Sequence, residues 1–140
     1  MCLERAIEPG LIDAYLAELA ELKASSPSPL SVTSFSPPDP VPYSPEILAN
    51  HISMRTEDDY FFAHNARPVL FHPRIVSFLT AAFDGQPMLT QSLNFEEGSA
   101  QAVHQDTAFV TMTSPLKFAG VWIALEDVQP GSGELVLLPW

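Results

Sequence analysis

His104, Gln105 and Asp106 form the triplet in this sequence whose residue types and spacing could do chemistry. In an extended strand, residues two positions apart project from the same face, so the imidazole of His104 and the carboxylate of Asp106 could grip one metal ion. Two histidines and one carboxylate on one face of an octahedral ion leave three positions open, which is the ligand set of non-heme Fe(II) oxygenases. Taken alone, the triplet favours a surface or capping role over a ligand role, because a His-x-Asp pattern arises often by chance.

The elements before this triplet are predicted to be mainly helical. Residues 9–23 follow a helical repeat, with proline in the tolerated first turn. Their apolar stripe of Ile12, Leu16 and Leu19 is expected to pack on the outer face of a sheet. A second stripe predicts a helix over residues 73–83, which an Asp-Gly pair ends.

The segments around these helices are predicted to be mostly irregular. Residues 25–45 hold seven prolines, so we expect a surface loop or a lid over a site. Residues 2–7 could form a short strand, and residues 45–51 could form one or two helical turns. The acidic run at residues 57–59 is expected in a solvated turn.

Strand signals dominate after residue 87. Turn clusters rich in glycine separate segments of strand-like composition. The predicted strands are residues 88–95, a segment within 100–110, residues 118–125 and residues 134–138. Helices followed by antiparallel strands predict an α+β fold with a sandwich or jelly roll in its second half.

The order of short motifs around the triplet resembles the phytanoyl-CoA dioxygenase family of Fe(II)/2-oxoglutarate oxygenases. That family has a His-Gln-Asp motif, a Trp-x-Ala-Leu-acidic-Asp strand end, an Asn/Ser-Gly-x-Leu turn and a Pro-Gly-Ser-His loop. The matching motifs here are QSLNF at 91–95, HQDT at 104–107, VWIALEDV at 121–128, GSGEL at 131–135 and LP at 138–139. Several spaced motifs in the right order are far more specific than the triplet alone.

The resemblance implies a fold and an activity. The fold would be a single partial domain over residues 1–140, with helices and a proline-rich loop in residues 1–86. Residues 87–140 would form the first strands of an incomplete double-stranded β-helix, the cupin-like jelly roll. The activity would be hydroxylation of a small organic substrate by a dioxygenase that uses Fe(II), with 2-oxoglutarate as co-substrate and ascorbate as an optional addition.

The resemblance also implies roles for particular residues. His104 and Asp106 would be two of three iron ligands. Gln105 would contact 2-oxoglutarate, and Trp122 would line the same pocket unless it only packs in the core. Gln91 would reach the co-substrate or else form a hydrogen bond within the sheet.

Two groups that the family uses do not follow the triplet. His104 is the last histidine and Arg74 the last arginine, so neither the third ligand nor a guanidinium for 2-oxoglutarate is present after it. A C-terminal truncation would explain both gaps, and we expect the 140-residue chain to be inactive. His51, His64 and His72 are expected to be surface or satisfied histidines, with His72 helping to cap the second helix.

The composition limits the class of partner and the location. Six basic residues against 17 acidic ones give a net charge of -11, which argues against nucleic acid or an anionic membrane as partner. One cysteine fits a reducing compartment and no apolar run reaches the length of a membrane span, so the cytoplasm is the expected location. A small-molecule substrate is the expected partner, and the oligomeric state is open. The alternatives to an enzyme are a non-enzymatic fragment or remnant, or a cupin-like small-molecule binder.

Overall fold

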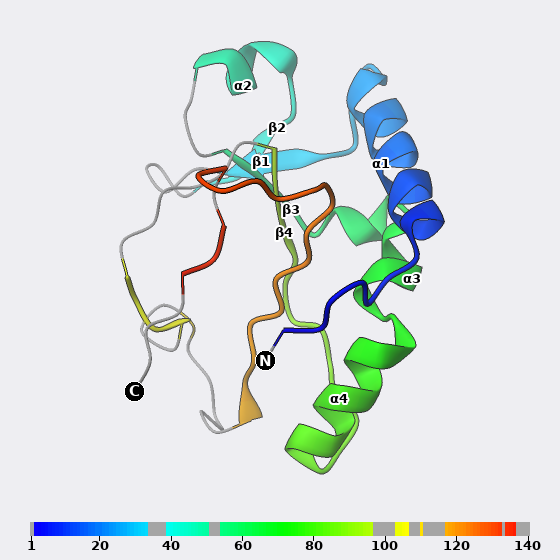
Figure 1. Ribbon diagram of the computed structural model, residues 1–140. Helices are drawn as coiled ribbons and strands as arrows, with labels where there is room; N and C mark the ends of the chain where they lie inside the picture. The colour runs from blue at the N-terminus through cyan, green and yellow to red at the C-terminus, as the bar shows by residue number, and fades with distance from the viewer. Residues whose placement is uncertain are drawn as a thin grey trace. The chain divides into compact units, whose positions relative to one another are not determined.

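The computed structural model describes residues 2–33, 39–50, 54–96, 103–106, 110, 117–132 and 134–136. The chain divides into two compact units, Met1–Glu97 and Gly98–Trp140. Every helix and strand found in these described ranges lies in the first unit (Figure 1). In chain order these elements are α1 (Pro9–Ala24), β1 (Ser31–Thr33), β2 (Val41–Pro42), α2 (Pro45–Asn50), β3 (Arg55–Glu57), the 3-10 helix η1 (Asp59–Phe61), α3 (Ala66–Leu70), α4 (Pro73–Phe83) and β4 (Leu93–Phe95).

Helix α1 confirms the helix predicted for residues 9–23 and extends one residue beyond it. Pro9 occupies the first turn, where its missing N–H costs no intrahelical hydrogen bond. The backbone becomes extended at Ser25, whose N–H donates to the carbonyl of Glu21 at 3.1 Å. The Ser25 hydroxyl donates to the carbonyl of Leu22 at 2.6 Å. Two carbonyl groups of the last turn, those of Glu21 and Leu22, therefore accept hydrogen bonds from residues beyond the helix.

The buried face of α1 differs from the predicted stripe at one position. Tyr15 and Leu19 are each only 3% exposed, whereas Leu16 is 38% exposed. The expectation that Leu16 packs in the core is wrong, because the packing neighbour of α1 is the short helix α3 (Figure 1). The apolar repeat fits either face, and a buried hydrogen-bond partner for the Tyr15 hydroxyl favours the face that holds the tyrosine.

Helix α4 confirms the second predicted helix, including both of its ends. The Nδ1 atom of His72 accepts a hydrogen bond from the N–H of Arg74 at 3.3 Å, so His72 caps the helix as predicted. Asp84 ends it in the left-handed conformation with a φ of 50°. Gly85 then donates its N–H to the carbonyl of Thr80 at 3.3 Å. The helical turns predicted near residue 45 are also confirmed, as α2.

The first unit contains a four-stranded antiparallel sheet in the order β2-β1-β3-β4. Val32 of β1 pairs with Thr56 of β3, which pairs in turn with Asn94 of β4. Val32 is 0% exposed and Thr56 is 3% exposed, so this row of residues lies in the core. The apolar core residues are Tyr15, Leu19, Leu30, Val32, Met54, Ala63, Ala66, Val69 and Ile75.

The strands lie largely outside the segments where the sequence predicts them. β1 and β2 lie in the proline-rich segment and β3 enters the acidic run, while only β4 falls within a predicted strand. Residues 2–7 and 118–125 form no strand, nor do the described parts of the predicted strands around residues 103 and 134. The observed strands are two or three residues long, which is too short for an alternating pattern to develop.

The fold is thus a mixture of helices and antiparallel strands, as the α+β prediction requires. The jelly roll in residues 87–140 stays a prediction. Within the ranges described above, no helix has the length and apolar character needed to cross a membrane.

Candidate functional site

His104 and Asp106 converge in the second unit. The Nε2 atom of His104 lies 3.4 Å from Oδ1 of Asp106. Their side chains are 30% and 55% exposed. Residues 103–106 do not form the predicted strand, and the carbonyl of Asp106 accepts the N–H of Val110 at 3.0 Å. The two side chains therefore converge without the strand from which their convergence was predicted.

The separation of these two atoms fits a shared metal ion. Two donors each about 2.1 Å from one ion, at right angles to each other, lie about 3 Å apart. The observed 3.4 Å is close to that value, and imidazole with carboxylate is a ligand pair that Fe(II) accepts. Among the described residues, no group of three or more His, Cys, Asp or Glu side chains is arranged to hold a metal. The pair therefore fits two positions of a ligand set.

Gly120 lies against the other oxygen of the same carboxylate, a feature that sequence reasoning missed. A Cβ built on Gly120 would stand 2.6 Å from Oδ2 of Asp106. A side chain at position 120 would therefore force the carboxylate to shift. The two residues are 14 positions apart, and no motif spacing links them.

The proposed co-substrate residues are exposed. Gln105, which lies between His104 and Asp106 in the sequence, is exposed. Trp122 is 51% exposed. This exposure disfavours the alternative that Trp122 only packs in a core. Gln91 is exposed in the first unit, two residues before β4. The roles of these three residues toward 2-oxoglutarate stay predictions.

The histidines before the triplet differ in their surroundings. His72 uses Nδ1 as the cap acceptor of α4, and its Nε2 lies 3.1 Å from a carboxylate oxygen of Glu8. A backbone hydrogen bond, and next the contact with His72, lower the pKa of the Glu8 carboxyl. His72 is thus the satisfied histidine that was predicted, His64 is exposed, and His51 lies outside the described residues.

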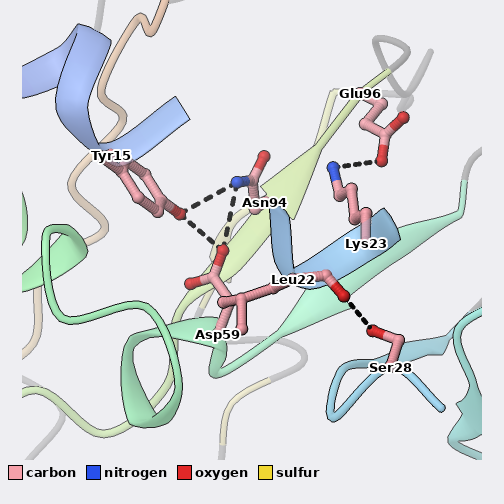
Figure 2. Close-up of polar contacts among 7 residues, drawn as sticks. All are labelled: Tyr15, Leu22, Lys23, Ser28, Asp59, Asn94 and Glu96. Carbon is pink, nitrogen blue, oxygen red and sulfur yellow. Dashed lines mark hydrogen bonds and ion pairs between the residues drawn. The ribbon is translucent and has the colours of Figure 1, made fainter. Parts of the chain in front are cut away.

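A buried polar cluster of Tyr15, Asp59 and Asn94 lies in the first unit (Figure 2). The Tyr15 hydroxyl donates to Oδ2 of Asp59 at 2.5 Å, and the Asn94 amide donates to the Tyr15 oxygen at 2.9 Å and to the same Asp59 oxygen at 3.2 Å. Asp59 is 1% exposed, so the expectation of a solvated acidic turn is wrong at this residue. Burial, and next the negative charge of Asp59, raise the pKa of Tyr15 far above its ordinary range. The cluster joins α1, η1 and β4.

A second link joins the end of α1 to the end of β4 (Figure 2). The ammonium group of Lys23 pairs with the carboxylate of Glu96 and lies 5.9 Å from the centroid of the Tyr43 ring. Glu96 is the residue directly after β4. The middle of α1, at Tyr15, and its end, at Lys23, are therefore linked to β4 and to the residue that follows it.

The comparison with known proteins agrees with the family that the motif order suggests. A family model described as phytanoyl-CoA dioxygenase (PhyH) matches residues 1–139. No curated protein and no solved structure gives a match to the chain. Since the family match spans nearly the whole sequence, the chain belongs to the phytanoyl-CoA dioxygenase family.

Proposed function

We propose that this chain forms part of an Fe(II)- and 2-oxoglutarate-dependent dioxygenase that hydroxylates a small organic molecule. Membership of the phytanoyl-CoA dioxygenase family supports an oxygenase. The observation that carries the assignment of the site is the 3.4 Å separation of His104 Nε2 and Asp106 Oδ1. A lone structural histidine or a solvated aspartate would need no such convergence.

His104 and Asp106 are the residues that would hold the iron. His104 would offer the lone pair of Nε2, and Asp106 would offer a carboxylate oxygen whose negative charge offsets part of the charge of a divalent ion. When bound, Fe(II) with 2-oxoglutarate and dioxygen supplies the oxidising power for hydroxylating an unactivated C–H bond. Asp106 and His104 are both partly exposed.

Gln105 and Trp122 would shape the surroundings of the co-substrate. Gln105 carries an amide that can donate to a carboxylate of 2-oxoglutarate, and its neighbours in sequence are the two ligands. The exposed ring of Trp122 offers an apolar wall that would exclude water from one side of the site. Gln91 would add a second amide donor. A third iron ligand is still needed, because His104 and Asp106 fill only two ligand positions. A cation for the far carboxylate of 2-oxoglutarate is also needed, because no arginine follows Arg74.

Metal binding tests the proposal directly. Co(II), an oxygen-stable substitute for Fe(II), is titrated into the purified 140-residue chain and followed by calorimetry and visible absorption. We expect weak binding by the native chain, and a loss of affinity of at least tenfold in His104→Ala and in Asp106→Ala. His64→Ala is the matched control, since His64 is exposed and lies in the other unit. Equal affinity in the native chain and in His104→Ala would refute the site.

An activity measurement accompanies the titration. The chain is incubated with Fe(II), 2-oxoglutarate and ascorbate, and succinate is measured. With two ligands of three, we expect no succinate above the level of His104→Ala. Succinate that appears in the native chain and is lost in His104→Ala would support the enzyme and contradict the expected inactivity.

A further inference from the structure

Gly120 differs from the other glycines that the structure describes in what surrounds its Cα. A Cβ built on Gly10 or on Gly131 would meet nothing within 4 Å, and one on Gly85 would meet only the carbonyl oxygen of Phe83 at 3.9 Å. A Cβ on Gly120 would stand 2.6 Å from Oδ2 and 3.9 Å from Cγ of Asp106. Of these four positions, Gly120 is the one where an added Cβ would force a neighbouring group to shift.

Backbone conformation does not explain this glycine. Gly131, with a φ of 84°, is the described glycine that needs the left-handed region. Gly120 has no positive φ, so any residue could adopt its backbone conformation. What a glycine provides at position 120 is space beside the Asp106 carboxylate.

We propose that Gly120 is a positioning residue, whose bare Cα leaves the Asp106 carboxylate the space in which it faces His104. The inference rests on the proposed function only in taking this carboxylate as a metal ligand. The two carboxylate oxygens divide the contacts between them: Oδ2 lies against Gly120, and Oδ1 lies 3.4 Å from His104 Nε2. A carboxylate is rigid and planar, so a group that pushes Oδ2 also moves Oδ1.

The size of the displacement follows from the contact distance. An ordinary van der Waals contact begins at 3.4 Å, and the 2.6 Å that a Cβ would have is 0.8 Å shorter. The Asp106 side chain is 55% exposed and can swing toward solvent. Gly120→Ala should therefore change the position of the carboxylate relative to His104 and leave the fold intact.

The first test needs no metal. In ¹H–¹³C spectra of the full 140-residue chain, the His104 ring signal is assigned by its absence in His104→Ala. We expect Gly120→Ala to shift this signal and Gly85→Ala to leave it in place. In an Asp106→Ala background the shift caused by Gly120→Ala should vanish, because no carboxylate remains to be displaced. A shift of equal size in both backgrounds, or no shift in either, overturns the proposal.

The second test measures metal affinity. Gly120→Ala should weaken Co(II) binding by roughly 10- to 100-fold, the usual effect of losing a group that orients a ligand, while Gly85→Ala should not. If His104→Ala loses affinity and Gly120→Ala keeps that of the native chain, the positioning role is wrong. If the native chain and His104→Ala bind Co(II) equally, the proposed function fails, and the spectra alone decide whether Gly120 positions Asp106.

Discussion

The Tyr15 hydroxyl donates a hydrogen bond to the Asp59 carboxylate at 2.5 Å, and so joins α1 to η1 across 44 residues of sequence. Tyr15 is 3% exposed and Asp59 is 1% exposed, so neither group can exchange this partner for water. Asn94 of β4 donates to both of them. One buried cluster thereby determines how a helix, a 3-10 turn and an edge strand of the sheet meet.

Tyr15→Phe should destabilise the chain, because it removes the hydroxyl and leaves the rest of the ring. A hydrogen bond to a charged group contributes about 1.5–3 kcal/mol, so we expect a loss of that size in the free energy of unfolding. Urea denaturation measures it. Tyr60→Phe is the matched control, since the Tyr60 ring stacks on Phe61 and its hydroxyl makes no hydrogen bond to a described residue. Equal losses in the two variants would contradict a special role for Tyr15.

The stability should also fall at high pH because of Tyr15. Burial, followed by the charge of Asp59 and the hydrogen bond to it, raises the pKa of Tyr15 far above its ordinary value of about 10. Above that pH the unfolded chain loses the proton and the folded chain keeps it, so the free energy of unfolding decreases as pH rises. Below it, the contribution is complete. Urea denaturation on both sides of the ordinary value should show a shallower decrease in Tyr15→Phe, and identical slopes would contradict the cause.

Leu19→Ala should lower the free energy of unfolding more than Leu16→Ala. The predicted stripe, which contains both leucines, gave no reason to expect a difference. Leu19 is 3% exposed, and truncating a buried leucine costs about 2–5 kcal/mol. Leu16 is 38% exposed, and surface substitutions stay within about 0.5 kcal/mol. Thermal and urea unfolding of both variants measure the difference. A cost above 2 kcal/mol for Leu16→Ala would show that its surface is covered in solution.

The helices could be predicted from the sequence because their signals are local. Pro9 and Pro73 occupy first turns, and the αL residue Asp84 with Gly85 ends α4, so start and stop signals lie within a few residues of what they control. The strands β1 and β3 could not be predicted in this way. Each has three residues, and each becomes a strand by pairing with the other across more than twenty positions.

The candidate site likewise has one feature that could be predicted from the sequence and one that could not. His104 and Asp106 converge as the sequence predicts, but the strand that was expected to bring them together is not there. The contact of Asp106 with Gly120 joins residues 14 positions apart, which no local pattern encodes. Asp59 was predicted to be solvated for the same reason, because its partner Tyr15 lies 44 positions away.

His72 should support the start of α4 through its ring nitrogen. Its Nδ1 accepts the N–H of Arg74, so His72→Ala should cost about 0.5–2 kcal/mol, the usual effect of removing a capping side chain. His72→Asn retains a side-chain acceptor and should recover part of that loss. His64→Ala is the control, since His64 is exposed and caps no helix. Equal stability of His72→Ala and His64→Ala in urea would contradict the capping role.

Substitutions of Asp58, in the turn that leads from β3 into η1, should destabilise the chain. Its φ is 49°, in the left-handed region, and its carboxylate accepts the N–H of Ser92 at 2.7 Å. Its own N–H donates to the carbonyl of Ser92 at 3.0 Å, so main chain and side chain together hold the segment before β4. Asp58→Ala loses the charged hydrogen bond, about 1.5–3 kcal/mol. It also adds about 1 kcal/mol of strain, because alanine lacks the polar side chain that helps aspartate to adopt the left-handed conformation.

Two further variants separate these contributions. Asp58→Gly loses the hydrogen bond but adopts the left-handed conformation freely, and Asp58→Asn keeps an acceptor oxygen and tolerates that conformation. The free energy of unfolding in urea should therefore decrease in the order native, Asn, Gly, Ala. If Gly is as stable as Asn, the Ser92 bond contributes nothing and the turn is held by backbone conformation alone. If Ala is as stable as Gly, the left-handed conformation is not retained, and the turn that carries Asp59 into contact with Tyr15 is formed in another way.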